Sequence, residues 1–259
     1  MEIAWSLLVV LALVGFVAGF VDSIAGGGGL LALPSLLLAG LDPVSALATN
    51  KLQGTFGTAS ATHTFWKKGL LHPEKHLPET VLVFIGAALG VVAVAYAPTR
   101  LLQAVLPPLL ILIALYFALS PKLSVDGSKP KLTYGVFAFV LAPLIGFYDG
   151  IFGPGTGSFF MLALVSLFGV GLIEATGRTK LLNFTSNIAS LLVFMAGGKI
   201  IWTIGITMGL AQLLGAQLGA RLAIKNGANI IRPLLVIVCI AMAAKLLLDP
   251  ANPFRAIFQ

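Results

Sequence analysis

The chain has 259 residues, of which 58% are hydrophobic and 10% are charged, and its formal net charge is +7. A typical soluble domain has about 25% charged residues, so this composition excludes an ordinary water-soluble fold. The basic residues stand singly or in short loops between apolar runs, which is typical of membrane topology signals rather than of a nucleic-acid surface. We therefore expect a lipid bilayer as the main surroundings and no nucleic acid as a partner.

Ten apolar segments follow one another along the chain, and their lengths predict helices rather than the short alternating strands of a barrel. They cover approximately residues 3–22, 29–41, 44–66, 78–97, 100–119, 132–152, 157–171, 181–198, 200–222 and 229–248. Because a helix needs about 20 residues to cross a bilayer, the second and seventh segments are predicted to be half-helices or re-entrant elements. The sequence predicts an all-α polytopic membrane protein with about eight to ten membrane segments.

A polar linker at residues 120–131 separates two halves, 1–119 and 132–259, that repeat one another. The stretch GFVDSIAGGG, which starts at Gly19, matches GFYDGIFGPG, which starts at Gly146, at six of ten positions. Further along, Lys51 aligns with Lys180, and the isolated glycines Gly86 and Gly90 align with Gly215 and Gly219. We interpret the two halves as a duplicated unit of four to five helical segments.

Charge placement predicts how the two repeats are oriented. The loop after the third segment contains Lys67, Lys68 and Lys75, whereas the equivalent loop of the second half contains only Lys199. Since basic residues favour the cytoplasmic side, equivalent loops with opposite bias indicate inverted repeats with five crossings each. Eight crossings with re-entrant short segments are the alternative.

The glycine clusters are the strongest local signals for a binding site. Each cluster interrupts an apolar stretch just before a short segment, where the N–H groups and partial positive charge of a new helix can attract an anion. Close helix packing is the alternative role, and it is favoured for Gly86 and Gly90. The candidate substrate-binding glycines are Gly26, Gly27, Gly28, Gly153, Gly155 and Gly157.

Asp22 and Asp149 occupy equivalent positions just before the two glycine clusters. Carboxylates inside a bilayer are costly and are usually functional, so these residues are candidates for proton or cation coupling. Alternatively, each carboxylate braces the broken helix by accepting backbone N–H bonds. Both roles remain open from the sequence.

A polar stretch follows each short segment and supplies the remaining candidate substrate ligands. Cationic and amide donors suit an oxyanion, and the spacing of several of these residues places them on shared helix faces. The alternative for the two lysines is that they extend toward the membrane surface. The candidates are Asn50, Lys51, Gln53, Arg178, Lys180, Asn183 and Asn187.

Catalytic, cofactor and metal motifs are not expected. Cys239 is the only cysteine, and His72 and His76 lie in a proline-containing loop without a metalloprotease pattern. The sequence contains no phosphate-binding GxxxxGK[ST] motif, so any driving force is expected to come from gradients. A membrane enzyme with Asp22 and Asp149 as paired acids would need a further catalytic group, for which the sequence shows no candidate.

The stretch GFVDSIAGGGGLLALPSLLLAGLDPVSALATNKLQG, echoed by GFYDGIFGPGTGSFFMLALVSLFGVGLIEATGRTKLLNF, resembles the sulfite exporter TauE/SafE family. The resemblance covers essentially the whole chain and implies a multi-pass permease of a prokaryotic inner membrane for small sulfur-containing anions, such as sulfite or organosulfonates. The second copy has Gly177-Arg178 where the first has Ala48-Thr49, so we expect the second repeat to contribute more positive charge.

The mechanism that we expect is alternating access, in which the two repeats move around an anion held between the broken helices. An anion channel and a permease for small organic anions without sulfur are the alternatives. A homo-oligomer is left open.

Overall fold

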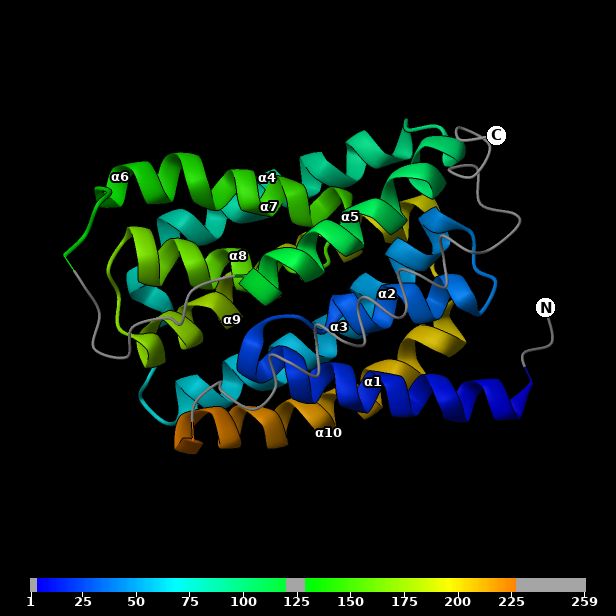
Figure 1. Ribbon diagram of the computed structural model, residues 1–259, viewed down its shortest axis with the longest axis horizontal. Helices are drawn as coiled ribbons and strands as arrows, with labels where there is room; N and C mark the ends of the chain where they lie inside the picture. The colour runs from blue at the N-terminus through cyan, green and yellow to red at the C-terminus, as the bar shows by residue number, and fades with distance from the viewer. Residues whose placement is uncertain (1–3, 120–128, 227–259) are drawn as a thin grey trace.

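The computed structural model describes residues 4–119 and 129–226, and this part of the chain is helical and contains no strand. Its helices pack side by side along the long axis of the molecule (Figure 1). They are α1 (Trp5–Ala25), α2 (Gly29–Leu38), α3 (Pro43–Lys67), α4 (Leu77–Ala95), α5 (Thr99–Leu119), α6 (Tyr134–Val136), α7 (Ala142–Ile151), α8 (Thr156–Leu162), α9 (Leu172–Gly197) and α10 (Trp202–Asn226). The tenth predicted segment, Cys239 and most of the linker lie outside the described residues.

Three single turns complete the chain path. A 3₁₀ turn, η1 (Pro73–His76), leads into α4, and two π-helical turns, η2 (Phe137–Leu141) and η3 (Ala163–Leu167), join α6 to α7 and extend α8. The two short helices that the sequence predicted are present as α2 and α8. The predicted start of the eighth segment at residue 181 is wrong, because α9 begins at Leu172 with a polar first half that hydropathy does not reveal.

Glycines allow α1 to pack closely against α10 and α4 against α7. A Cβ atom on Gly90 would lie 2.2 Å from the carbonyl oxygen of Phe147, and one on Gly219 would lie 2.3 Å from that of Phe20. Gly86 approaches the α7 backbone in the same way. Helix packing, the alternative considered for these isolated glycines, is therefore their role.

Helices α1 and α3 of the first half run opposite to α7 and α9 of the second half (Figure 1). In Figure 1, α1 runs from right to left while α6 and α7 run from left to right, and α3 and α9 are opposed in the same manner. Each half also packs against the other half: α1 of the first half contacts α10 of the second, and α7 of the second half contacts α4 of the first. α3 and α9 contact each other directly.

The outer surface is apolar on several helices. Leu210, Leu214 and Leu218 recur every four residues along the exposed side of α10, and each is at least half exposed. Three stretches are long and apolar enough to cross a membrane within the part of the chain that the structure describes: Trp5–Ile24, Pro73–Ala95 and Tyr134–Ile151. This surface suits contact with lipid chains rather than water.

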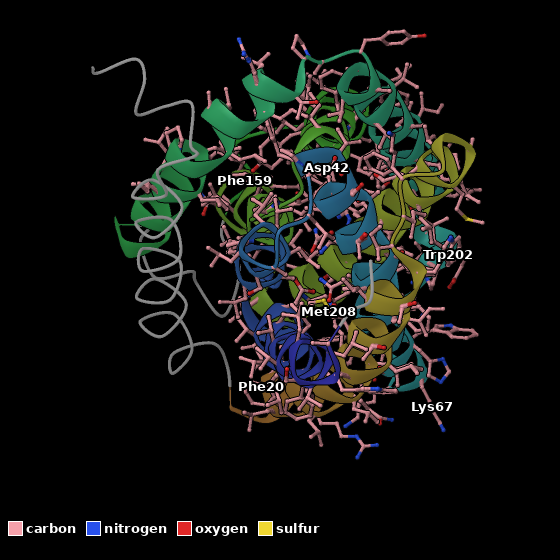
Figure 2. All side chains as sticks on the ribbon, turned by 90° about the vertical axis from the view of Figure 1, so that its right-hand side faces the viewer. Phe20, Asp42, Lys67, Phe159, Trp202 and Met208 are labelled. Atoms are coloured by element: carbon pink, nitrogen blue, oxygen red, sulfur yellow. The ribbon has the colours of Figure 1, made fainter. Side chains whose placement is uncertain are left out.

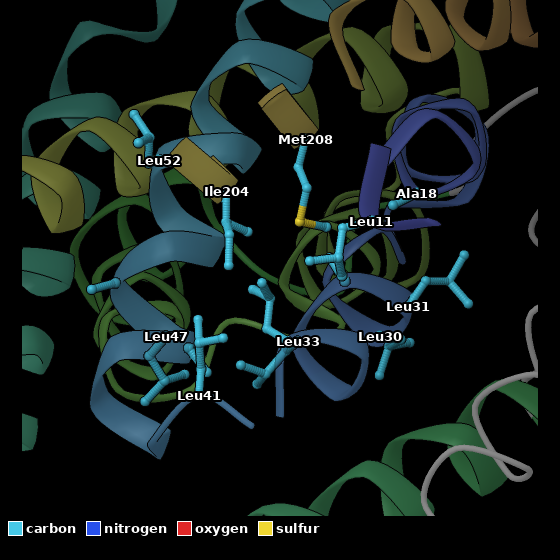
Figure 3. Packing of buried hydrophobic residues seen from close by; sticks show 14 of the residues in the cluster. Leu11, Ala18, Leu30, Leu31, Leu33, Leu41, Leu47, Leu52, Ile204 and Met208 are labelled. Carbon is cyan, nitrogen blue, oxygen red and sulfur yellow. The ribbon is translucent and has the colours of Figure 1, made fainter. Parts of the chain in front are cut away.

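Apolar side chains also fill the space between α1, α2, α3 and α10 (Figure 3). Leu33 of α2, Leu47 of α3 and Ile204 of α10 are buried together there. In the end-on view of Figure 2, Met208 lies toward the interior, whereas Trp202 and Lys67 lie at the margin. The core holds the broken helix α1–α2 against the central helix α3.

Candidate functional site

Both glycine clusters break a helix in the middle of the molecule. α1 ends at Ala25 because Gly26 adopts a left-handed conformation with φ 77°, and Gly153 and Gly155, with φ 89° and 83°, separate α7 from α8. The two breaks touch, since a Cβ atom on Gly26 would lie 2.5 Å from the carbonyl carbon of Gly157. Only glycine permits this conformation and this approach at Gly26.

A cavity of about 30 Å³ lies between the breaks and the central helices α3 and α9. This volume holds roughly two water molecules. The described residues that line the cavity are Asp22, Gly26, Gly29, Asn50, Lys51, Gln53, Gly54, Thr58, Asp149, Gly153, Gly155, Gly157, Asn183, Asn187 and Gln212. The lining is thus almost entirely polar side chains and glycines, in a protein with an apolar exterior.

Most of the predicted site residues gather around this cavity, although four of them do not line it: Gly27, Gly28, Arg178 and Lys180. Gly29 and Gly54 also line the cavity. They belong to the repeated stretches but were not among the predicted substrate-binding residues. Thr58, which lies beyond these stretches, was not predicted. From the sequence, Gln212 could either line a pathway or form hydrogen bonds between helices, and the structure places it at the cavity.

Two ion pairs cross between the repeats at the cavity. Lys51 Nζ of α3 lies 2.7 Å from Asp149 Oδ2 of α7, and Lys180 Nζ of α9 lies 3.6 Å from Asp22 Oδ2 of α1. Both lysines are at most 1% exposed, so the idea that they extend toward the membrane surface is wrong. Each lysine is balanced by the aspartate of the other repeat.

The two aspartates have different surroundings. Asp22 Oδ1 accepts the N–H of Gly28 at 3.1 Å, and the Asp22 main-chain oxygen accepts both the N–H of Gly26 and a hydrogen bond from Lys180 Nζ. The bracing contact considered for Asp22 is therefore present. Two N–H groups that we expected to face an anion, those of Gly26 and Gly28, are bonded to Asp22 in this conformation.

The second break is braced by neighbouring residues. The Tyr148 hydroxyl donates to the carbonyl oxygen of Pro154 at 2.6 Å, and the Thr156 hydroxyl donates to that of Gly153 at 2.7 Å. Because these two hydroxyl groups brace the second break, the Asp149 carboxylate is not needed there, and its partner among the described residues is Lys51.

Amide side chains from α3, α9 and α10 form much of the rest of the lining. Gln53 Nε2 donates to Asn50 Oδ1 at 2.8 Å, and Asn187 packs across Gly54, where a Cβ atom would lie 3.3 Å from Asn187 Oδ1. Gln53 Oε1 and Gln212 Oε1 are buried and have no hydrogen-bond partner within residues 4–119 and 129–226. Buried polar groups rarely stay unsatisfied, so these amides point to a ligand or water in the cavity.

Arg178 belongs to a separate cluster. Its guanidinium group lies 2.7 Å from Glu79 Oε1 of α4 and is flanked by the Phe137 and Phe168 rings, 4.9 and 5.2 Å from their centroids. Arg178 and Lys180 are two positions apart, which places them about 200° apart around α9. The expected extra positive charge of the second repeat is therefore directed away from the cavity and balanced by Glu79.

Glu79 also accepts a hydrogen bond from the Tyr134 hydroxyl and lies 3.1 Å from His76 Nδ1. Glu79 is fully buried. Little in the sequence indicates this, because the residue stands near the start of an apolar segment next to a polar loop. Within that loop, His72 and Glu74 are largely exposed.

An apolar helical protein with broken helices around a polar, ion-paired cavity belongs to the class of membrane transporters. The sulfite exporter TauE/SafE family matches residues 11–246, and the chain belongs to this family. The resemblance seen in the repeated motifs is thereby confirmed.

Several curated relatives match along nearly the whole chain. "Probable membrane transporter protein ORF9" of Sinorhizobium sp. is 50% identical over 98% of this chain and 97% of its own length. "Probable membrane transporter protein YfcA" of Escherichia coli K12 is 47% identical over 94% of this chain and 90% of its own. A "Probable membrane transporter protein" of Haemophilus influenzae is 43% identical over 96% and 98%. No solved structure matches the chain.

Proposed function

We propose that this protein is a secondary transporter that moves small anions across a prokaryotic inner membrane, with sulfite and organosulfonates as the leading substrates. The observation that carries the proposal is the polar cavity between the two broken helices, which receives side chains from both repeats. The family description, sulfite exporter, supports the choice of sulfur-containing anions.

The donors at the cavity suit an oxyanion. Lys51 supplies an ammonium group, and Asn50, Gln53, Asn183 and Asn187 supply amide groups that can donate to sulfur-bound oxygens. Because these groups come from α3 and α9, an anion between them would contact both halves at once. We include Gly153, Gly155 and Gly157 in this site and leave out Arg178, which is paired with Glu79.

We propose alternating access between inverted repeats as the transport mechanism. The opposite directions of these helices in the two halves and the contacts between the halves support this arrangement (Figure 1). The cavity has room for roughly two water molecules, so we expect the helices around it to move apart when a sulfite ion, which has four non-hydrogen atoms, is loaded. Movement of one inverted repeat against the other can open the cavity to one side of the membrane at a time.

The purified protein in liposomes tests the proposal by counterflow of labelled sulfite, thiosulfate, methanesulfonate and acetate. Saturable exchange of the sulfur anions, faster than that of acetate, is the expected result. Fast exchange of acetate alone would move the substrate class to carboxylates, and large anion currents in planar bilayers would identify a channel. No exchange of any of these anions would refute the proposal.

The matched variants for this experiment are Asn183→Ala, which removes a cavity amide, and Lys68→Ala, which removes an exposed charge at the end of α3. The first should slow exchange, and the second should leave it unchanged. Equal slowing in both variants would mean that the cavity amide of Asn183 has no specific role in exchange.

A further inference from the structure

The fixed charges around the cavity cancel in this conformation. Lys51 is paired with Asp149 and Lys180 with Asp22, and all four side chains are at least nine-tenths buried. An anion that entered this site would be an additional buried charge without a partner. Because such a charge is strongly disfavoured, one of the two carboxylates must lose its charge, or one lysine must change partner, when the anion binds.

The two pairs differ in how readily they can separate. Asp22 is held through its carboxylate by Gly28 and through its main chain by Lys180, so its release would loosen the break between α1 and α2. Within the described chain, Asp149 makes no comparable hydrogen bond to the break between α7 and α8, because Tyr148 and Thr156 brace that break. The Lys51–Asp149 pair can therefore open while its surroundings keep their shape.

Other ionisable groups near α7 do not offer a competing site for the proton. The long helices α4 and α9 that pack against α7 carry Glu79, Glu174, Arg178 and Lys180. Glu79 and Arg178 pair with each other, Glu174 is exposed, and Lys180 is held by Asp22 of α1. On α7 itself, the Tyr148 hydroxyl donates to Pro154.

We propose that each monoanion is carried together with one proton, that Asp149 takes up this proton, and that Lys51 exchanges Asp149 for the anion. This inference rests on the proposed function and specifies its energy coupling. In the loaded state, protonated Asp149 is neutral and Lys51 balances the anion, so the net charge of the cavity stays the same. When the anion and the proton leave, the Lys51–Asp149 pair forms again.

An unpaired amide oxygen at the cavity is compatible with a protonated carboxyl group there, because the carboxyl group then donates a hydrogen bond and the amide oxygen can accept one. Gln53 Oε1 lies on the same helix as Lys51 and has no partner within the described chain, although it is buried at the cavity. A Cβ atom on Gly153 would lie 3.2 Å from Lys51 Nζ and 3.5 Å from Asp149 Oδ1, so the glycine leaves room for the pair. The cavity lining thus contains both the proposed proton acceptor, Asp149, and an uncommitted hydrogen-bond acceptor, Gln53 Oε1.

The experiment follows protons and anions together in liposomes that contain the wild-type protein. Methanesulfonate is the preferred probe, because it stays a monoanion at all accessible pH values and any proton that moves must be bound by the protein. We expect one proton to enter for each methanesulfonate ion, and we expect uptake to respond to a pH gradient but not to an imposed membrane potential. Uptake driven by the potential without proton movement would overturn the inference.

The Asp149→Asn variant should lose accumulation driven by a pH gradient while keeping counterflow exchange at no less than about half the wild-type rate. Asp22→Asn is the comparison, because it should lower the melting temperature and reduce exchange and driven uptake together. Accumulation at the wild-type level in Asp149→Asn would overturn the inference. The proton count in the wild type decides the question if Asp149→Asn does not fold.

The two proposals fail in different ways. Exchange of anions without any proton movement would leave the transporter proposal intact and remove the coupling. If methanesulfonate is not exchanged, the number of protons moved per anion is measured with the anion that exchanges fastest in the counterflow series. The protons that this anion itself carries at the assay pH are subtracted from the count. The absence of exchange for every anion would remove both proposals.

Discussion

Lys51 Nζ lies 2.7 Å from Asp149 Oδ2, and the equivalent residues of the duplicated sequence, Lys180 and Asp22, form the second pair at 3.6 Å. Each lysine thus contacts the aspartate of the other repeat. The two halves of the chain are joined by ion pairs at the point where the broken helices meet, so a movement of one half against the other would alter these contacts directly.

Lys51→Ala is expected to weaken anion binding by about ten- to a hundred-fold, because one charge-assisted contact contributes roughly 1.5–3 kcal/mol. Isothermal titration with sulfite and methanesulfonate measures the effect. Lys68→Ala, an exposed change at the C-terminal end of the same helix, is the control and should bind with wild-type affinity. Unchanged affinity in Lys51→Ala would remove this residue from the site.

Arg178→Ala is expected to destabilise the protein by about 3–5 kcal/mol, because it leaves the buried Glu79 carboxylate without its main cationic partner. A melting curve in detergent shows the loss, and Glu174→Ala, an exposed change on the same helix, serves as the control. The affinity of the remaining folded fraction for anions should be unchanged. A large loss of affinity at normal stability would return Arg178 to the substrate site.

Gly90→Ala is expected to disrupt packing between α4 and α7, since the added Cβ atom would lie 2.2 Å from the Phe147 carbonyl oxygen. The helices must move apart to relieve this overlap, at a cost of about 1–3 kcal/mol or more. Gly197→Ala, at a position with open space around it, is the matched control. Thermal stability of both variants decides the matter, and equal melting temperatures would contradict the packing role.

The loop that contains Lys67, Lys68 and Lys75 and the linker at 122–131 are expected on the cytoplasmic side, with Lys199 on the opposite side. The prediction follows from the opposite charge bias of equivalent loops. In Figure 1, α3 ends at the left of the bundle and α9 ends at the right, which agrees with it. Labelling of single cysteines at positions 68 and 199 in a Cys239→Ala background tests the arrangement. Labelling of both positions from the same side of the membrane would contradict it.

The helical architecture could be predicted from the sequence because it depends on local composition. Long apolar runs require helices in lipid, and glycine clusters at Gly26 and Gly153 mark the places where a helix can turn left-handed and stop. The amide pair of Asn50 and Gln53 followed from helical spacing in the same way. The start of α9 was missed because its first turns are polar and hydropathy alone does not recognise a buried polar helix.

The sequence by itself determined the helices, their breaks, the similarity of two stretches in the two halves and most of the polar residues that line the cavity. Each of these is a property of a short stretch of chain. Only the tertiary structure decided the partners. Helical spacing shows which residues share a face, but it does not show which helix that face meets, so the crossed Lys–Asp pairs were not predictable. The same holds for Arg178, which is close to Lys180 in sequence but lies against Glu79 of α4 instead of the cavity. The carboxylate that neutralises this buried guanidinium group comes from another helix, and only the fold shows which one.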